Sequence, residues 1–270
     1  MKSQEFIDKN KGNDKKRQIR LNKVILKPKN KKDYSEILFF GDVHYGHPQC
    51  LDDEAKRMLK YAYEKGIYVL IMGDLIEAGL RDSVGDSVYQ QKLNPQKQME
   101  EMIEWLRPLA KKGLIIGIHE GNHEYRITKA TGIDITKIMA RILDIPYLGY
   151  SCWHLLKIGD QNYTMYTTHG TSSSKFKHTK MKAVMDLIQW IDADIIAMGH
   201  VHSIASEPVI KQSVSLKNKI VDERKCYVVL TGSYLSWDRS YAQMKNMPIT
   251  KIGSPKAKLF INKKDVHFSL

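Results

Sequence analysis

Five short apolar segments of this chain each run directly into a motif that combines glycine with aspartate, asparagine or histidine. The segments are residues 36–40, 67–72, 114–118, 163–167 and 194–198. The motifs are, in the same order, Gly41-Asp42-Val43-His44, Gly73-Asp74, Gly121-Asn122-His123-Glu124, Thr168-His169-Gly170 and Gly199-His200-Val201-His202. Short apolar runs bounded by glycine are typical of strands in a covered sheet, and α/β sheets build sites just beyond the strand ends. The motifs therefore predict an α/β fold with one site assembled from five loops.

Helical patterns fill the intervals between the predicted strands. Residues 52–64, 95–107, 133–143 and 179–191 place apolar side chains at the spacings of an amphipathic helix. Asn94 and Pro95 are suited to cap and begin the second of these helices, and Pro108 is expected to end it. A chain of 270 residues can bury a substantial core, so we expect one large α/β domain rather than two small ones.

The motifs supply seven side chains able to bind divalent metal ions, together with one further histidine, His123. The seven are Asp42, His44, Asp74, Asn122, His169, His200 and His202. Carboxylate oxygen and neutral imidazole nitrogen are ligands of hard and borderline divalent cations. Residues two apart in an extended chain point the same way, so the two Asp/His-x-His pairs are expected to face one metal cluster.

The combined motifs D-x-H, G-D, G-N-H-E, H-G and G-H-x-H extend over about residues 36–240 and resemble those of calcineurin-like metallophosphoesterases. The similarity to the bacterial and phage nuclease-like branch of that superfamily is looser. The resemblance implies a four-layer αββα sandwich, in which two mixed β-sheets are flanked by helices and two metals lie at the strand ends. It also implies a phosphoester hydrolase in which a hydroxide bridging the metals attacks phosphorus.

The resemblance further implies which residues hold each ion. One metal would be bound by Asp42, His44, Asp74 and His202. The other would be bound by Asp74, Asn122, His169 and His200, so that Asp74 bridges the two. Mn²⁺ is the expected ion, with Fe, Zn or Ni as alternatives. His123 corresponds to the family's proton donor, a role that suits imidazole because its ordinary pKa is near 6.5.

Three neighbouring side chains are weaker candidates for contact with substrate: Arg126, His47 and Arg81. An arginine fork can clamp a phosphate, although surface ion pairs explain many such residues. His47 is equally consistent with an exposed loop. Glu77 stands where relatives often carry Asp or Asn, which leaves its role open.

Two further regions near the motifs are candidates for contact with substrate. Lys175, Lys177 and His178 follow the His169 motif, where contact with an anionic substrate is one alternative and a solvated loop is the favoured one. Residues 78–93 and 207–224 read as long insertions beside the motifs, where substrate specificity would be encoded.

The positive charge of the chain is concentrated at its beginning. Residues 1–32 contain twelve Lys and Arg against three acidic residues, a surplus of nine out of the net charge of +13. We therefore divide the chain into a basic N-terminal arm, 1–32, and a metallophosphoesterase domain, 33–270. Residues 19–26 alternate enough to form a strand on the body. A basic arm attracts the phosphates of nucleic acid, and a solubilising tail or a protein-binding arm is an equally open reading.

Composition bounds the setting in which the protein works. No apolar run approaches the ~18 residues of a membrane-spanning helix, and the charged N-terminus lacks the apolar core of a secretory signal. Cys50, Cys152 and Cys226 show no metal-binding spacing and are expected to be reduced thiols in a cytoplasmic protein.

Three functions are compatible with these features. The first is a metal-dependent phosphodiesterase or nuclease that acts on DNA or RNA, favoured by the basic balance. The second is a phosphatase or phosphodiesterase for a small nucleotide. The third, from a different class, is a non-catalytic scaffold of the same fold, which the intact set of ligands disfavours.

Overall fold

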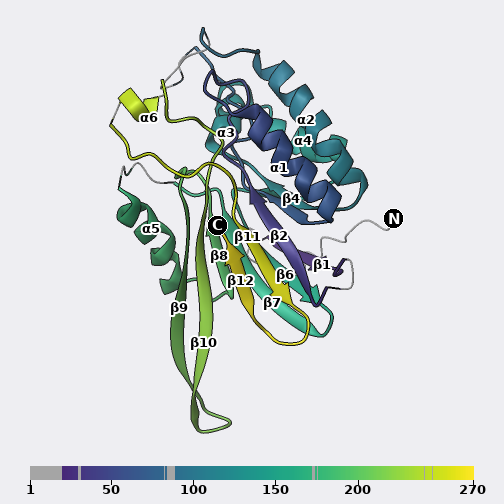
Figure 1. Ribbon diagram of the computed structural model, residues 1–270, viewed down its shortest axis with the longest axis vertical. Helices are drawn as coiled ribbons and strands as arrows, with labels where there is room; N and C mark the ends of the chain where they lie inside the picture. Colours follow the sequence, from purple (N-terminus) through teal and green to yellow (C-terminus); the bar gives the residue numbers. More distant parts are fainter. Residues whose placement is uncertain are drawn as a thin grey trace.

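A computed structural model describes residues 20–29, 32–81, 83, 89–171, 174, 176–239, 241–244 and 246–270. Its core is formed by two mixed sheets of six strands, with helices on the outer faces (Figure 1). This is the predicted four-layer αββα sandwich.

The first sheet has the order β12-β11-β2-β3-β4-β5. Its strands are β2 (Tyr34–Phe40), β3 (Tyr68–Ile71), β4 (Ile115–His119), β5 (Tyr147–Gly149), β11 (Lys256–Phe260) and β12 (Val266–Ser269). Strands β2 to β5 run parallel to one another. Strand β11 pairs antiparallel with β2, and β12 pairs antiparallel with β11. Every residue of β3 and β4 is buried, because one face meets the other sheet and the opposite face is covered by helices.

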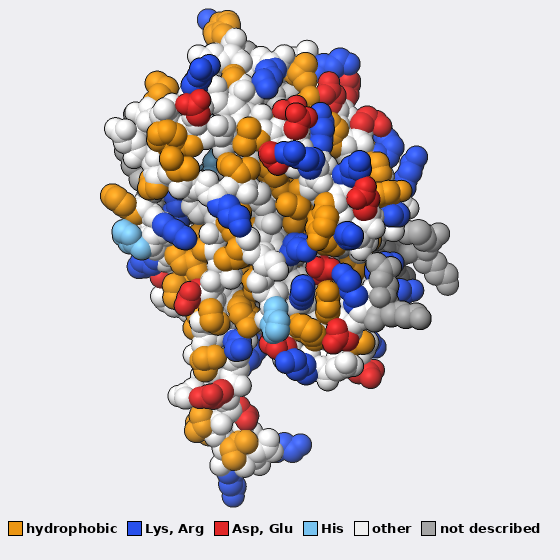
Figure 2. All heavy atoms as spheres, in the orientation of Figure 1, with side chains coloured by type: hydrophobic (Ala, Val, Ile, Leu, Met, Phe, Trp, Pro, Cys, Tyr) orange, Lys and Arg blue, Asp and Glu red, His pale blue; other side chains and the backbone are white. Residues whose placement is uncertain are grey.

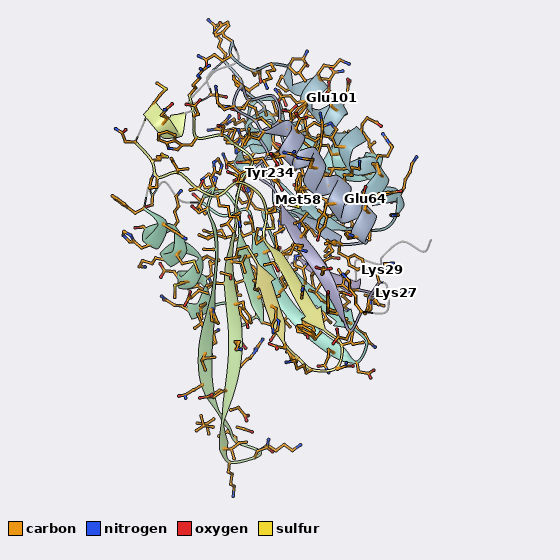
Figure 3. The ribbon with its side chains drawn as sticks, viewed as in Figure 1. Lys27, Lys29, Met58, Glu64, Glu101 and Tyr234 are labelled. Carbon is orange, nitrogen blue, oxygen red and sulfur yellow. The ribbon has the colours of Figure 1, made fainter. Side chains whose placement is uncertain are left out.

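The second sheet has the order β1-β6-β7-β8-β10-β9. Its strands are β1 (Leu21–Ile25), β6 (Ser151–Ile158), β7 (Gln161–Thr168), β8 (Ile195–Met198), β9 (Ile204–Ser215) and β10 (Ile220–Thr231). The strand expected at residues 19–26 is confirmed as β1, which pairs parallel to β6. After β1, the chain carries Lys27 and Lys29 along the body (Figure 3), and the Lys27 N–H donates to the Tyr68 hydroxyl at 2.9 Å. Part of the basic segment is therefore built into the sandwich.

Helices α1 (Asp52–Lys65), α2 (Pro95–Lys111) and α4 (Ile135–Leu143) cover the first sheet, and α5 (Lys177–Met185) packs on β8 and β10 of the second (Figure 1). The expectation that Pro108 ends the second helix is wrong, because α2 continues to Lys111. A proline removes only one hydrogen bond of the last turn, and the burial of Leu109 keeps that turn packed. The fourth predicted helix is shorter than expected, since α5 gives way to a 3₁₀ turn at Asp186–Gln189.

Two further helices were not predicted. Helix α3 (Asn122–Thr131) begins inside the third motif, and α6 (Tyr241–Met244) is one short turn. Gly121 precedes α3 and donates its N–H to the Glu124 carboxylate at 3.0 Å. Glu124 is the third residue of the helix and so takes the place of the acidic residue in a capping box. Asn122 and His123 therefore lie at the start of a helix rather than in an open loop.

The interpretation of residues 207–224 as an insertion beside the site is wrong. They belong to the β9–β10 hairpin, whose two strands pair along twelve residues. The hairpin leaves the body at Ile204, just after the last motif, and its tip projects from the opposite end of the molecule (Figures 1 and 2). At about 3.3 Å per residue the tip lies on the order of 35 Å from that motif. Of residues 78–93, the structure describes 78–81, 83 and 89–93.

Within the described part of the chain, none of the helices is both long and apolar enough to cross a membrane. The three cysteines are buried free thiols.

A buried polar chain joins the two sheets through Asn22, His154, Thr167 and His119. The Asn22 amide donates to the Ile116 carbonyl of the first sheet at 3.0 Å. The His119 Nδ1–H donates to the Gly149 carbonyl at 2.8 Å, so His119 Nε2 accepts from the Thr167 hydroxyl at 2.6 Å. His154 Nε2 must then donate to the same hydroxyl oxygen, at 2.7 Å. Both histidines are held neutral, because burial lowers the pKa of His119 to about 3 and holds that of His154 well below its ordinary value.

This chain predicts a loss of stability in mild acid. The folded pKa of each histidine lies below the unfolded value of about 6.5, so falling pH favours the unfolded state, by up to about 1.4 kcal/mol per pH unit for each group. His154→Gln preserves a donor toward Thr167 and removes one titrating group. Urea unfolding in chelator from pH 7.5 to 5 should show a shallower decline for this variant than for the parent. His267→Gln, at an exposed position, is the matched control, and parallel curves for His154→Gln and the parent would contradict the assignment.

Candidate metal centre

The five motifs meet at one edge of the sandwich. Asp42 and His44 follow β2, Asp74 follows β3, and residues 122 and 123 begin α3 after β4, all in the first sheet. Residues 169, 200 and 202 follow β7 and β8 of the second sheet. The structure therefore brings all eight predicted side chains together from both sheets.

The alternating pairs face the centre for a reason different from the one expected. Asp42, His44, Asp74, His200 and His202 all have left-handed backbone, with φ between 48° and 66°, rather than extended chain. Such backbone is strained for residues other than glycine and clusters at functional sites. Bonds between motifs hold it, since the Asp42 N–H donates to the Gly73 carbonyl at 2.9 Å and the His44 N–H to the Asp74 carbonyl at 3.0 Å.

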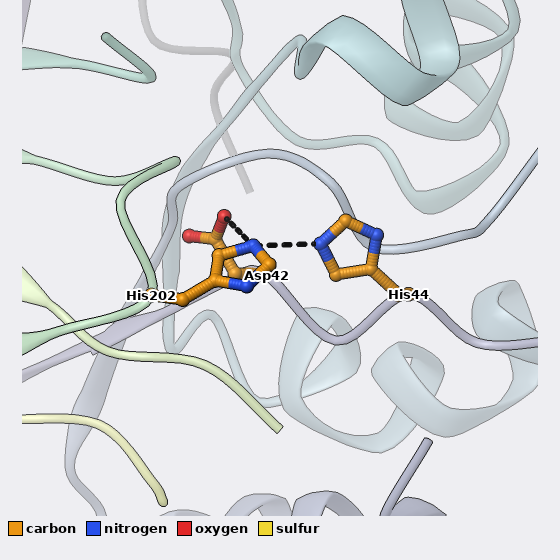
Figure 4. Close-up of side chains that lie close together, drawn as sticks. All are labelled: Asp42, His44 and His202. Carbon is orange, nitrogen blue, oxygen red and sulfur yellow. Dashed lines mark hydrogen bonds and ion pairs between the residues drawn. The ribbon is translucent and has the colours of Figure 1, made fainter. Parts of the chain in front are cut away.

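Each of the two aspartates uses one oxygen for structure and leaves the other without a hydrogen bond. Asp42 Oδ2 accepts from the His200 N–H at 3.0 Å, and Asp74 Oδ1 accepts from the His123 N–H at 2.8 Å. Asp42 Oδ1 and Asp74 Oδ2 are buried, and none of the described residues forms a hydrogen bond with either oxygen. A ring nitrogen of His202 points toward the Asp42 carboxylate (Figure 4), and the distance from Nε2 to Oδ1 is 3.3 Å. A buried carboxylate oxygen without a donor is costly unless a positive charge completes its surroundings.

Ring nitrogens converge on these free oxygens because their other nitrogens are occupied. His169 Nδ1–H donates to the Met72 carbonyl at 2.8 Å, which turns Nε2 toward Asp74 Oδ2 at 3.3 Å. His44 Nδ1 lies 3.2 Å from Glu77 Oε2, which turns Nε2 toward His202 Nε2 at 3.0 Å (Figure 4). Metal-binding histidines are commonly oriented by a partner on the second ring nitrogen in this way.

The ligand atoms form three overlapping groups, each with all its atoms within 4.8 Å of one another. The groups are Asp42–His44–His202, His44–Asp74–His123 and Asp74–His169–His200. Asn122 adds an oxygen to the third group, 2.9 Å from His169 Nε2 and 2.7 Å from His200 Nδ1. Hard or borderline divalent cations fit this donor set, and Asp74 belongs to two of the three groups.

The ionisable side chains of the centre strongly shift one another's pKa values. Burial opposes the charge on Asp74, but His169 and His123 hold its pKa well below the ordinary value. In return, and against the effect of burial, Asp74 raises the pKa of His169 to about 10. Burial and the neighbouring His123 lower the pKa of His44 to about 4. Asp74 thus favours positive charge on the groups around its free oxygen.

Glu124 is a structural element of the site that could not be assigned from the motifs alone. Its buried carboxylate accepts from the backbone N–H groups of Asp74, Leu75 and Ile76 at 3.0, 2.7 and 3.1 Å, in addition to Gly121. Burial and the nearby Asp74 raise its pKa to about 7. The available signal was its position at the end of Gly-Asn-His-Glu, where a carboxylate caps the helix. Glu124 fixes the second motif against the third.

Glu77, whose role was left open, lies beneath two of the histidines. In addition to its contact with His44, its backbone carbonyl accepts from His123 Nδ1–H at 2.9 Å. Against the effect of burial, both histidines hold the pKa of the Glu77 carboxyl far below its ordinary value. Arg126 Nη2 lies 3.0 Å from His123 Nε2, and Nη1 lies 3.5 Å from Glu77 Oε1. Arg126 therefore reaches the centre.

Of the other weaker candidates, the structure places His47 beside the centre and Arg81 on the surface. His47 is buried and lines the cavity over the centre, so the exposed-loop reading of it is wrong. Arg81 is exposed, and among the described residues no contact joins it to the centre. Lys177 and His178 lie in the first turn of α5 rather than in a loop, and both are exposed; Lys175 lies outside the described residues.

A cavity of about 350 Å³ opens directly over the centre. Metal-binding side chains line part of the cavity. Its apolar wall is formed by Leu235, Trp237, Met247 and Pro248, interspersed with the polar residues Ser233, Ser236 and Thr250. No sequence signal marked it, because these residues come from a late segment without a motif and reach the centre only through the fold.

The match to a family model covers residues 35–232, most of the chain, and the model describes calcineurin-like phosphoesterases. No curated protein sequence matches. Similar solved structures include a metallophosphoesterase from Sphaerobacter thermophilus, 13% identical over 86% of this chain and 87% of that one, with a TM-score of 0.38.

Two further solved structures resemble the chain to a similar degree. One is a conserved uncharacterized protein of Streptococcus pneumoniae TIGR4, a predicted phosphoesterase, 14% identical over 87% and 88% of the two chains, with a TM-score of 0.39. The other is a Vps29 double mutant from Entamoeba histolytica, 15% identical over 87% and 98%, with a TM-score of 0.37. These likenesses are distant, and the assignment rests on the family model. The chain belongs to the calcineurin-like phosphoesterase family and is a phosphoester hydrolase.

Proposed function

We propose that this protein is a phosphodiesterase that uses two divalent metal ions to cut DNA or RNA. The observation that carries the two-metal part is the pair of buried carboxylate oxygens without donors, Asp42 Oδ1 and Asp74 Oδ2, on which ring nitrogens converge. One ion would be held by Asp42, His44, Asp74 and His202. The other would be held by Asp74, Asn122, His169 and His200. Mn²⁺ is our first expectation for both.

Bound ions of this kind polarise phosphoryl oxygens and lower the pKa of water toward neutrality. The protein's own part is to hold the ions, to place the phosphate and to protonate the leaving oxygen. His123 is the proposed donor of that proton. Its Nδ1–H is fixed on the Glu77 carbonyl, so Nε2 is the atom left for chemistry. Although burial opposes it, Asp74 raises the pKa of His123 and favours the protonated ring.

Arg126 would assist the proton transfer if its guanidinium moved away from His123 and bound the substrate phosphate. In the structure its guanidinium donates to His123 Nε2 at 3.0 Å, which requires that this nitrogen carry no proton. A phosphate oxygen in the cavity is a better acceptor for an arginine fork. When Arg126 turns to substrate, His123 Nε2 is free to carry its proton.

The preference for nucleic acid is supported by an aromatic hollow beside the centre. Tyr150, Trp153 and Tyr166 line this hollow of about 470 Å³. The Tyr150 ring centroid lies 6.0 Å from that of His169, and the Trp153 and Tyr166 rings lie 5.4 Å apart. Aromatic faces next to basic groups are typical of sites that stack the bases of single strands. The sequence showed no aromatic stripe, because Trp153 and Tyr166 come from two strands that pair in the fold and Tyr150 lies between β5 and β6.

Basic charge enters the same hollow from the arm. Arg20 lines it, and residues 1–19, which precede Arg20, contain six basic and three acidic residues. The carboxyl of Glu120 also lines the hollow, and burial raises its pKa. The hollow thus combines aromatic side chains with one basic side chain, and its Tyr150 ring contacts the ring of His169.

Asp74→Asn should cause the largest loss among the ligand substitutions, because a bridging carboxylate serves both ions. Equilibrium dialysis against micromolar Mn²⁺ and elemental analysis should find up to two ions per parent chain and fewer in the variant. Hydrolysis should fall by more than the roughly 10–100-fold seen when only a supporting residue is removed. Asp160→Asn, in an exposed turn, is the matched control. A variant with unchanged metal content and activity would overturn the bridge.

His123→Asn should separate metal binding from catalysis, since asparagine can still donate to the Glu77 carbonyl. We expect retained metal and a kcat lower by about 10²–10⁴, the range for losing a general acid. The loss should be smaller for a nitrophenyl ester, whose leaving group needs no proton. Equal losses for good and poor leaving groups, or loss of metal, would show that His123 is not the proton donor.

Removal of the basic arm tests whether the substrate is nucleic acid or a small nucleotide. Only residues 1–17 should be removed, because β1 belongs to the sheet. Each phosphate that the arm no longer neutralises should lower the slope of log K against log salt by about 0.7–0.9, while hydrolysis of an aryl diester stays constant. A full-length variant with glutamine at the basic positions of this segment controls for chain length: Lys2, Lys9, Lys11, Lys15, Lys16 and Arg17. An unchanged slope contradicts the role of the arm, and no binding or cutting of any polynucleotide favours the small-nucleotide enzyme.

A further inference from the structure

Lys180 is a buried cation in the wall of the cavity over the metal centre. It lies in α5, is only 8% exposed, and lines the cavity together with His200 and His202. In the part of the chain that the structure describes, its Nζ has one weak hydrogen bond, to Ser203 Oγ at 3.4 Å. Within the described ranges no carboxylate forms an ion pair with it.

The ammonium group of Lys180 is buried, and none of the described acidic side chains lies close enough to neutralise it. Burial lowers the pKa of its ammonium group, and no neighbouring charge offsets that effect. Lys182, two residues further along α5, shows the usual alternative, since it is exposed and paired with Asp186 at 2.5 Å. An ammonium taken out of water without an anion is unfavourable for the fold. The position of Lys180 is therefore explained best by an anion that binds beside it.

The cavity has room for more than the phosphoryl group at the metal centre. Its volume of about 350 Å³ is in the range of small-molecule sites, and its apolar wall includes Leu235 and Trp237. A nucleoside packed on that wall would carry one phosphate toward the metal-binding side chains. A second phosphate on the same nucleoside would then meet Lys180.

We infer that Lys180 binds a second phosphate of the substrate, adjacent to the phosphodiester that is cleaved. This inference rests on the proposed function, because it takes the cleaved bond to lie at the metal centre. It makes a chain with successive phosphates, rather than an isolated diester, the preferred substrate of the cavity. Lys180 is then a residue of substrate specificity and takes no part in the bond-breaking step.

Matched nitrophenyl substrates test the inference directly. The probes are thymidine 5′-(4-nitrophenyl phosphate) and thymidine 3′-(4-nitrophenyl phosphate), each with and without a second phosphate on the other hydroxyl. All four release nitrophenolate, so one assay measures them all, and the two pairs cover both polarities of the strand. The proteins are the parent, Lys180→Met, Lys180→Arg and the exposed control Lys182→Met, all loaded with Mn²⁺.

The parent should prefer the doubly phosphorylated member of at least one pair by about tenfold or more in kcat/KM, the scale of one charge-assisted hydrogen bond. Lys180→Met should lose this preference and keep the parent rate on the singly phosphorylated compounds. Lys180→Arg should restore part of the preference, and Lys182→Met should match the parent. Because Lys180→Met removes a buried charge, its Tm should be equal to or above that of the parent.

Several results would overturn the inference. They are a parent with no preference, a preference retained in Lys180→Met, or an equal loss on all four substrates with a lowered Tm, which is the signature of a structural role. Failure of the proposed function looks different, because the parent would then hydrolyse none of the four compounds despite bound Mn²⁺. That result would remove the inference together with its basis.

Discussion

The architecture of the site depends on two buried carboxylates, in each of which the two oxygens have different roles. Asp42 and Asp74 each commit one oxygen to a backbone N–H of another motif and keep the second free of donors. The committed oxygens join loops that are distant in the sequence. The free oxygens create a strong demand for positive charge between the sheets. The same two residues thus assemble the motifs and define what the assembled site can bind.

Support for this arrangement comes from acidic side chains that do not themselves face the cavity. Glu124 gathers backbone N–H groups of the second and third motifs, and Glu77 fixes the orientation of His44. A Cβ on Gly121 would lie 2.1 Å from the Asp74 nitrogen, so only glycine allows these two motifs to approach each other. The strained left-handed turns are therefore held by several independent contacts, as strain at a functional site requires.

Much of the fold and the composition of the site could be predicted from the sequence, because each strand and its motif are contiguous. Asp74 follows an uninterrupted apolar run, and that local pattern was sufficient to place it at a strand end. Helix α3 was missed because its start overlaps the motif read as a loop. The pairing of residues 207–224 was missed because a polar, exposed hairpin lacks the apolar run of a covered strand. Lys180 and Trp237 join the site only through tertiary packing, for which no local signal exists.

We propose that two metal ions share Asp74, and anomalous diffraction from crystals grown with Mn²⁺ measures this most directly. We expect two manganese peaks about 3.5–4 Å apart, with the Asp74 carboxylate next to both and the Asp42 carboxylate next to one of them. A single peak, or two peaks that do not share Asp74, would contradict it.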